Sequence, residues 1–236
     1  MMEHDFSKVK SKIEEACKEG EYAGNYAFVP LRLDQLSNII DNGEKQGYMR
    51  KGQTVLDMGS GSSSSSILWA HRGYNVVGIE LQPNLVHIAE LALYTCQDII
   101  PEGLEVKIYQ GSYFPESYHN KRLSGKSSAI AEENKVAGNG NPGDYYLFPP
   151  FKEDAYKKNN INLNDIDVFY AYAWQMQAPS ILEIFKDYAR DDATLCMVGP
   201  TSQKYVKALG LIPCWDDDKR LPLYWERYVR KIPAGK

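Results

Sequence analysis

The pattern of apolar residues predicts two short buried strands joined by a helix between residues 53 and 80. Residues 53–58 and 75–79 form aliphatic and β-branched runs, which are typical of strands buried on both faces. Between them, the glycine turn 59–61 and a serine run lead into an amphipathic segment, 67–72, which ends at Gly73. A strand, a turn, a helix and a second strand within about thirty residues predict a right-handed, parallel βαβ unit.

The rest of the chain continues this alternation of helices and strands. Helical spacing of apolar residues predicts helices, and alternating or continuous apolar runs predict strands. The predicted helices cover residues 5–19, 31–46, 180–189 and 203–209, with another beginning at Gln82-Pro83; the predicted strands cover 104–109, 165–172, 193–198, 212–215 and 223–232. This order predicts an α/β fold.

The turn between the first two strands has the chemistry of a nucleoside site. Its glycines permit positive φ and a close approach of ligand to backbone, and the following helix begins with unpaired N–H groups. Glu80, at the carboxyl end of the second strand, is placed to accept hydrogen bonds from both hydroxyls of a ribose. A dinucleotide fingerprint requires a third glycine where the chain has Ser64, and Asp57 is unfavourable beside a pyrophosphate. Asp57 suits a ligand that carries a cationic amino group.

The segment 55–80 therefore resembles motif I and the following acidic position of the class I S-adenosylmethionine (SAM)-dependent methyltransferases. Their pattern is two hydrophobic residues followed by Asp-x-Gly-x-Gly. The resemblance implies a Rossmann-like sheet of seven strands, the last one antiparallel, with helices on both faces. It also implies SAM as cofactor, as donor or as substrate. The cofactor-binding residues that we predict are Asp57, Gly59, Ser60, Gly61, Glu80, Leu81, Ser112, Tyr113 and Tyr22. Nicotinamide binding and a purely structural turn are the two alternatives.

Two segments outside this core are candidates for covering the ligand. The first, 21–31, is rich in aromatic residues and precedes a core helix, so it is either a lid over cofactor or acceptor, through Tyr22 and Tyr26, or packing at the sheet edge. The second, 114–164, is far longer than the connection that the resembled family needs, and loops of such length are usually functional or disordered. Its aromatic content favours an ordered cover of the acceptor pocket, where we place Asn139. We expect one SAM-binding domain over residues 1–236, with residues 1–30 as an N-terminal helix and lid and residues 114–164 as the insertion that covers the pocket.

The predicted fourth strand, 165–172, provides the candidates for the reacting centre. Ligands of open α/β sheets lie at the carboxyl ends of the strands. Tyr170 and Tyr172 share one face of this strand, and Trp174 follows it. Tyr172 is the predicted catalytic contact, either as hydrogen-bond partner or as aromatic wall, and Tyr170 and Trp174 are predicted substrate contacts. A core tyrosine is the alternative for Tyr172.

Three functions fit these residues. The first is methyl transfer from SAM to a small molecule. The second uses the aminocarboxypropyl part of SAM, by chain transfer or by intramolecular cyclisation, and releases methylthioadenosine. Its motivation is the predicted turn 62–66, which resembles the Gly-Ser-Gly turn of nicotianamine-synthase-like enzymes. The third is SAM binding without catalysis.

Composition limits the classes of partner and cofactor that we expect this chain to bind. The net charge is −4, so no general basic field favours nucleic acid or an anionic membrane. The four cysteines lack a Cys-x-x-Cys pair and the four histidines do not cluster, which favours buried thiols and argues against a metal site. A charged amino terminus and the lack of a long apolar run suggest neither a signal peptide nor a membrane span. We expect a cytoplasmic monomer or homodimer acting on a small molecule.

Overall fold

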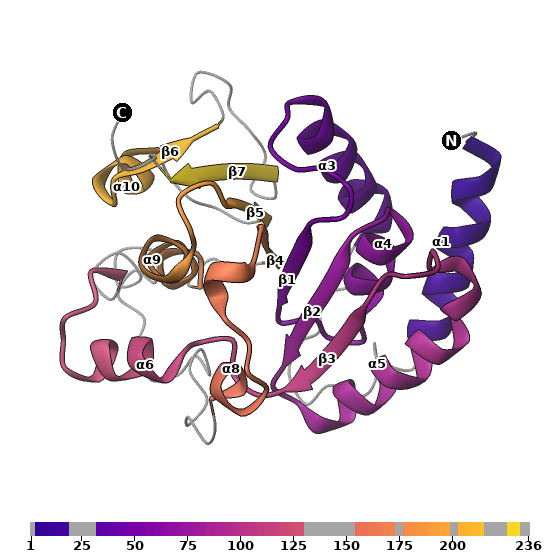
Figure 1. Cartoon of the computed structure of the whole chain (residues 1–236), viewed down its shortest axis with the longest axis horizontal. Helices are drawn as coiled ribbons and strands as arrows, with labels where there is room; N and C mark the ends of the chain where they lie inside the picture. The colour runs from indigo at the N-terminus through magenta and orange to yellow at the C-terminus, as the bar shows by residue number, and fades with distance from the viewer. Residues whose placement is uncertain are drawn as a thin grey trace, which may run out of the picture. The chain divides into compact units, whose positions relative to one another are not determined.

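The computed structural model describes residues 3–18, 32–129, 154–172, 177–198, 203–214 and 226–231. The chain divides into two compact units, Met1–Tyr113 and Phe114–Lys236. The described residues of the two units contain seven strands, three in the first and four in the second (Figure 1).

The first unit alternates helices with three strands. In chain order its elements are α1 (Glu3–Cys17), α3 (Leu33–Lys45), β1 (Thr54–Met58), α4 (Ser64–His71), β2 (Asn75–Glu80), α5 (Pro83–Thr95), the 3-10 turn η1 (Gln97–Ile99) and β3 (Val106–Gln110). The strands are parallel in the order β3-β2-β1. The predicted βαβ unit is therefore confirmed. Its register pairs Asp57 with Gly78 and Glu80 with Gln110, so the two acidic residues stand near the same ends of neighbouring strands.

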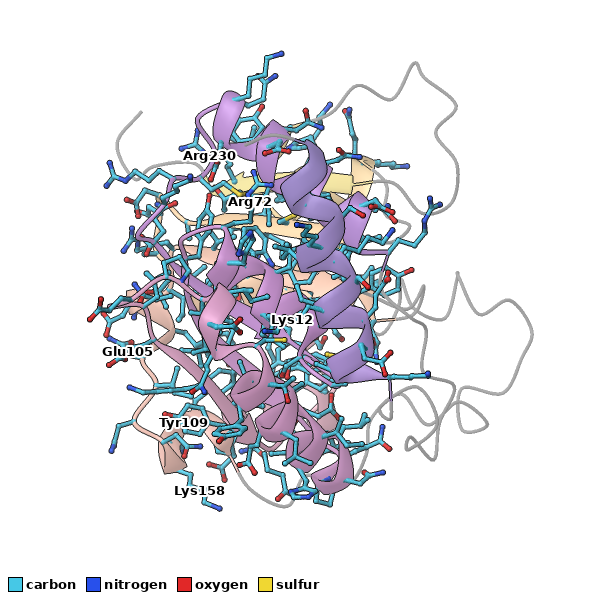
Figure 2. All side chains as sticks on the ribbon, turned by 90° about the vertical axis from the view of Figure 1, so that its right-hand side faces the viewer. Lys12, Arg72, Glu105, Tyr109, Lys158 and Arg230 are labelled. Atoms are coloured by element: carbon cyan, nitrogen blue, oxygen red, sulfur yellow. The ribbon has the colours of Figure 1, made fainter. Side chains whose placement is uncertain are left out.

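Helices α4, α5 and α1 pack together beside these strands (Figure 1). Ile13 of α1 and Leu68 and Trp69 of α4 are fully buried, as the apolar spacing of both segments requires. Figure 2 views this unit with α1 in the foreground, and the labelled Lys12 on it forms an ion pair with Asp98 of η1. One turn further along α1, the Cys17 thiol donates a hydrogen bond to the Ser62 carbonyl oxygen at 3.3 Å. Helix α1 is thus fastened directly to the serine run.

Helix α3 is held by the end of α4 and the start of β2. The largely buried Arg72 donates from Nη1 to the Ser37 hydroxyl at 2.9 Å and from Nη2 to the Asp41 carboxylate. The Tyr74 hydroxyl donates to Glu44 Oε1 at 2.8 Å. Charged hydrogen bonds to a helix surface are stronger than neutral ones, so these contacts fix the position of α3 on the first unit.

The second unit contains the remaining strands. Its elements are α6 (Glu116–Leu123), α8 (Ala155–Lys158), η3 (Leu163–Asp165), β4 (Val168–Tyr172), α9 (Ala178–Tyr188), β5 (Thr194–Val198), α10 (Gln203–Ala208), β6 (Leu211–Pro213) and β7 (Glu226–Lys231). The order is β4-β5-β7-β6. β4 and β5 are parallel, whereas β7 runs antiparallel to both β5 and β6, so the prediction of an antiparallel last strand is confirmed.

A buried carboxylate joins α6 to α9 within the second unit. Glu183 is only 3% exposed and accepts hydrogen bonds from the Lys121 ammonium at 2.6 Å, the Ser128 amide at 3.1 Å and the Ser127 hydroxyl. Burial by itself raises the pKa of Glu183, but the hydrogen bonds from Lys121 and Ser127 outweigh it and lower the pKa to about 2. Every oxygen of this carboxylate is used, so the cluster is a structural clamp.

Some element bounds differ from those predicted. β4 begins at Val168 and not at residue 165, because residues 163–165 form a 3-10 turn whose start is capped by the Asn162 side chain. Helices α6 and α8 lie inside residues 114–164, the segment predicted to be an insertion. Three cysteines, Cys17, Cys96 and Cys196, are buried, and Cys214 is partly exposed.

Candidate functional site

The glycine turn after β1 is stacked on the end of β2. The amides of Gly59 and Ser60 both donate to the Ile79 carbonyl oxygen, at 2.9 and 3.0 Å. Gly59 has φ of +82° and Gly61 φ of +57°, the left-handed region in which a side chain is strained. The glycines are therefore required by the backbone conformation that folds the chain back over β2, as the sequence predicted.

The serine run continues this turn into α4. Ser63 is also left-handed, with φ of +69°, and its amide donates to the Ser60 carbonyl oxygen at 2.8 Å. Helix α4 begins at Ser64, so the prediction of a turn through residue 66 is wrong for the last three serines. The hydroxyls of Ser60 and Ser63 are buried without a hydrogen-bond partner in the described structure. Such groups are costly unless something else satisfies them.

Glu80 closes the other side of the turn. It is 7% exposed, and its carboxylate accepts from the Gly61 amide at 2.9 Å and the Gln82 amide at 2.8 Å. Burial raises the pKa of Glu80, and these backbone hydrogen bonds oppose that rise without cancelling it. The carboxylate is thus held against the glycine turn, at the position from which the sequence predicts contact with a ribose.

Asp57, on β1, lies beneath the start of α4. It is 2% exposed, and the hydroxyls of Ser65 and Ser66 both donate to its Oδ2 at 2.6 Å. Burial raises the pKa of Asp57 to about 6, the two serine hydrogen bonds lower it, and the negative charge of Glu80 raises it again. The two carboxylates are therefore close enough to repel each other.

No cation compensates this pair within the described structure. None of the ion pairs of the described residues involves Asp57 or Glu80, and no positive side chain affects the pKa of either one. Buried charges in proteins are normally paired, and a buried pair of like charges is more unfavourable than either alone. The arrangement is suited to a ligand that brings positive charge together with hydroxyl donors.

Residues after β3 complete the described part of the site. The Gly111 amide donates to the Glu80 carbonyl oxygen at 2.8 Å, which brings Ser112 and Tyr113 beside the acidic strand end. A Cβ added at Gly59 would lie 3.5 Å from Cε1 of Tyr113, so the Tyr113 ring lies next to Gly59. Leu81, which follows Glu80, is 37% exposed. These predicted cofactor residues all belong to the first unit.

Sequence reasoning missed Gly78, two residues before Glu80. A Cβ at this position would lie 2.5 Å from Ile108 Cδ1 and 3.0 Å from the Ser60 hydroxyl oxygen. Gly78 therefore lets the Ser60 side chain and β3 approach β2 closely. A glycine inside a strand is the signal that could have identified it, because such glycines often mark a close approach of neighbouring groups. The donors Ser65 and Ser66 were also missed.

The predicted acceptor residues are only partly described. Tyr170 is buried in β4 and Tyr172 ends that strand half-buried, both within the second unit. Tyr22, Tyr26, Asn139 and Trp174 lie outside the described residues, as do the predicted lid, 21–31, and residues 130–153 of the predicted insertion. The roles of all six stay predictions.

Among the described residues, no group of three or more His, Cys, Asp or Glu side chains is arranged to hold a metal ion. No helix in that part of the chain combines the length and apolar character needed to cross a membrane.

Comparison with known proteins identifies the fold. No protein family model matches the sequence, and no curated protein matches it. Among solved structures, MtNAS in complex with MTA and tNA is 14% identical over 96% of this chain and 71% of the other, with a TM-score of 0.52. A variant of MtNAS in complex with S-adenosylmethionine is 14% identical over 96% of this chain and 73% of the other, also with a TM-score of 0.52. The ribosomal protein L11 methylase from Lactobacillus delbrueckii subsp. bulgaricus is 14% identical over 84% and 79% of the two chains, with a TM-score of 0.49.

The two similarities to MtNAS, with TM-scores of 0.52, show that the chain has a Rossmann-like α/β fold, as predicted. At this level of identity they show the fold alone. The chemistry has to be argued from the residues of this chain.

Proposed function

We propose that this chain is a SAM-dependent transferase that holds its donor at the turn between β1 and α4. The observation that carries the proposal is the pair of buried carboxylates, Asp57 and Glu80, beside a glycine turn, with no cation paired to them among the described residues. SAM brings an ammonium, a sulfonium and a ribose diol, which are the charges and donors that this pair lacks. The class I fold, shared with a solved complex of S-adenosylmethionine, supports the same ligand.

Each carboxylate has a role that its geometry permits. The Gly61 and Gln82 amides each donate to one Glu80 oxygen, and the Leu81 amide also bonds this carboxylate. A carboxylate has about four acceptor sites, so Glu80 can still accept from the ribose. Asp57 uses Oδ2 for two serine hydroxyls, which leaves Oδ1 for the ligand's ammonium. Tyr113 beside Gly59 offers an aromatic face to a cationic ligand.

The reaction that we propose first is methyl transfer to a small-molecule acceptor. A lone pair of the acceptor forms a bond to the methyl carbon, the carbon–sulfur bond breaks, and neutral S-adenosylhomocysteine leaves while the acceptor's proton passes to solvent. The protein mainly aligns the two partners and excludes water. Tyr172 is the proposed contact at the reacting centre, with Tyr170, Trp174, Tyr26 and Asn139 around the acceptor and Tyr22 against the cofactor.

A second candidate is transfer or cyclisation of the aminocarboxypropyl group. Two observations favour it: the serine-rich start of α4, and the fold similarity to MtNAS, which has been solved with MTA bound. In cyclisation the ammonium of SAM first loses a proton to solvent, and the resulting amine attacks the γ-carbon of the same molecule. A carbon–nitrogen bond forms, the carbon–sulfur bond breaks and methylthioadenosine leaves. Such a reaction needs no second substrate.

Calorimetry with the purified chain tests donor binding. We expect SAM and S-adenosylhomocysteine to bind with measurable heat, and NADH not to bind. Glu102→Gln removes an exposed carboxylate outside the site and controls for the loss of one negative charge. This variant should bind SAM and S-adenosylhomocysteine with the affinities of the wild type. Binding of NADH without binding of either sulfur nucleoside would remove the basis of the proposal.

Product analysis then separates the reactions. The protein is incubated with SAM alone and, in parallel, with SAM and a panel of small amines, alcohols, thiols and carboxylates. Methylthioadenosine formed above the rate of a protein-free control, without acceptor, supports the second candidate. S-adenosylhomocysteine formed only with an acceptor supports methyl transfer. Bound SAM with neither product would identify a binding module without catalysis.

A further inference from the structure

Two consecutive serines of α4 donate to the same oxygen of a buried carboxylate. The hydroxyls of Ser65 and Ser66 each lie 2.6 Å from Asp57 Oδ2. All three side chains are buried. Serine hydroxyls near the start of a helix commonly bond to local backbone groups, but these two bond to a carboxylate on the preceding strand.

The geometry favours one protonation state and one orientation of Asp57. Both hydroxyls donate to Oδ2, and hydrogen bonds to an ionised carboxylate are stronger than those to the protonated acid, so the two serines stabilise the ionised form. Because both donors lie on one side of the carboxylate, they also fix its rotation about χ2. No other donor among the described residues reaches Asp57, so its Oδ1 retains its capacity to accept.

We propose that Ser65 and Ser66 are positioning residues, which hold the Asp57 carboxylate ionised and oriented so that its Oδ1 receives the ammonium of the sulfur nucleoside. The inference rests on the proposed function for the identity of the ligand. The arrangement of the three side chains does not depend on it.

The electrostatics of the surroundings agree with this role. Burial raises the pKa of Asp57 to about 6, and the hydroxyls of Ser65 and Ser66 oppose that rise. The charged group that faces Asp57 from the neighbouring strand is Glu80, which raises its pKa further. On α4 the two serines are the groups that contact it, and the positive Arg72 at the opposite end of this helix is engaged by Ser37 and Asp41. Without the serines, Asp57 should therefore be protonated near neutral pH.

The experiment compares Ser65→Ala, Ser66→Ala and the double variant with Ser64→Ala. Ser64 belongs to the same helical turn but makes no hydrogen bond to Asp57 in the described part of the chain, so its variant controls for loss of a serine hydroxyl. Affinity for S-adenosylhomocysteine is measured by calorimetry from about pH 5.5 to about pH 8.5. We expect the double variant to shift the midpoint of the pH dependence upward by about one pH unit, which weakens binding about threefold near pH 6.5, about eightfold near pH 5.5 and very little near pH 8.5. Ser64→Ala should keep the wild-type profile.

A second measurement does not need the ligand. The carboxyl carbon resonance of Asp57 is titrated by NMR in the free protein, and the double variant should titrate at a higher pH than the wild type and Ser64→Ala. Ser65→Thr and Ser66→Thr, which retain the hydroxyls, should restore the wild-type values. If the double variant fails to fold, the two single alanine variants replace it in both measurements.

The outcomes distinguish this inference from the proposed function. An equal loss of affinity at every pH, or an unshifted Asp57 resonance, would overturn the positioning role even if SAM binds. Failure of the wild type to bind either sulfur nucleoside would refute the proposed ligand, and the NMR titration would still decide whether the two serines hold Asp57 ionised.

Discussion

Replacing Asp57 by asparagine is expected to stabilise the folded protein at pH 8 while it weakens the binding of SAM. Asp57 is almost fully buried, and its pKa is raised to about 6 from a usual value of 3.8. The folded state therefore binds this proton more tightly than the unfolded state does. Between those two values the contribution of Asp57 to stability falls as the pH rises, and above about pH 6 it stays at its lowest level.

The size of the effect follows from the two pKa values. A difference of about 2 pH units at 1.36 kcal/mol each corresponds to about 3 kcal/mol of lost stability above pH 6. An asparagine still accepts from Ser65 and Ser66 through its carbonyl oxygen, but its amide must be buried, which costs about 1 kcal/mol. The net gain at pH 8 is then about 2 kcal/mol, or roughly 4–8 °C in Tm for a chain of this size.

The assay is thermal unfolding of wild type and Asp57→Asn from about pH 4 to about pH 8. The difference in Tm should be largest at high pH and should disappear toward pH 4, where Asp57 is protonated in the wild type. The exposed Glu102→Gln control should change stability by less than about 0.5 kcal/mol throughout. A variant that is less stable than wild type by the same amount at both ends of the range would refute the reasoning, because it would mean that Asp57 is well solvated or already paired.

Three other predictions concern neighbouring features. Glu80→Gln should weaken SAM and S-adenosylhomocysteine about tenfold or more in calorimetry, since a charged acceptor is lost; unchanged affinity would mean that Glu80 does not meet the ligand. Gly78→Ala should destabilise the fold by about 1–3 kcal/mol in urea unfolding, because the new Cβ would lie 2.5 Å from Ile108 Cδ1. Ile108→Val removes that carbon, so the double variant should recover part of the loss, and no recovery would contradict the clash. The pKa of Glu183 is lowered to about 2 from 4.5. The ionised Glu183 carboxylate therefore stabilises the folded state above about pH 4.5, and this stabilisation is lost as the pH falls toward 2. Glu183→Gln should therefore flatten the acid side of the stability profile, and an unchanged slope would show that Glu183 is not its source.

The strands around the turn could be predicted closely from the sequence. β1 and β2 were expected at 53–58 and 75–79 and occur at Thr54–Met58 and Asn75–Glu80. Continuous apolar runs leave little freedom for a strand buried on both faces, and glycines mark its ends. The meeting of Asp57, the glycine turn and Glu80 was also predictable, because parallel register fixes which strand ends lie together.

The serine run shows what the local pattern could not reveal. Serine is a poor helix former that favours turns, so residues 64–66 were assigned to a turn. They form the first turn of α4 because the hydroxyls of Ser65 and Ser66 find a partner in Asp57, eight and nine residues earlier. A hydrogen bond between a strand and the following helix depends on the crossover geometry, which hydrophobic periodicity does not contain. The sequence therefore identified the acidic groups and missed the donors that orient one of them.

Because Cys17 donates a hydrogen bond to the Ser62 carbonyl oxygen, the rate at which its thiol is alkylated can report on opening of the segment next to the glycine turn. The thiol is buried, and alkylation requires the end of α1 to separate from the serine run. The rate at which a small maleimide labels Cys17 therefore reports how often this joint opens, and site-resolved mass spectrometry distinguishes it from the faster labelling of the partly exposed Cys214. A nucleoside that closes the turn should lengthen the labelling half-life of Cys17 alone.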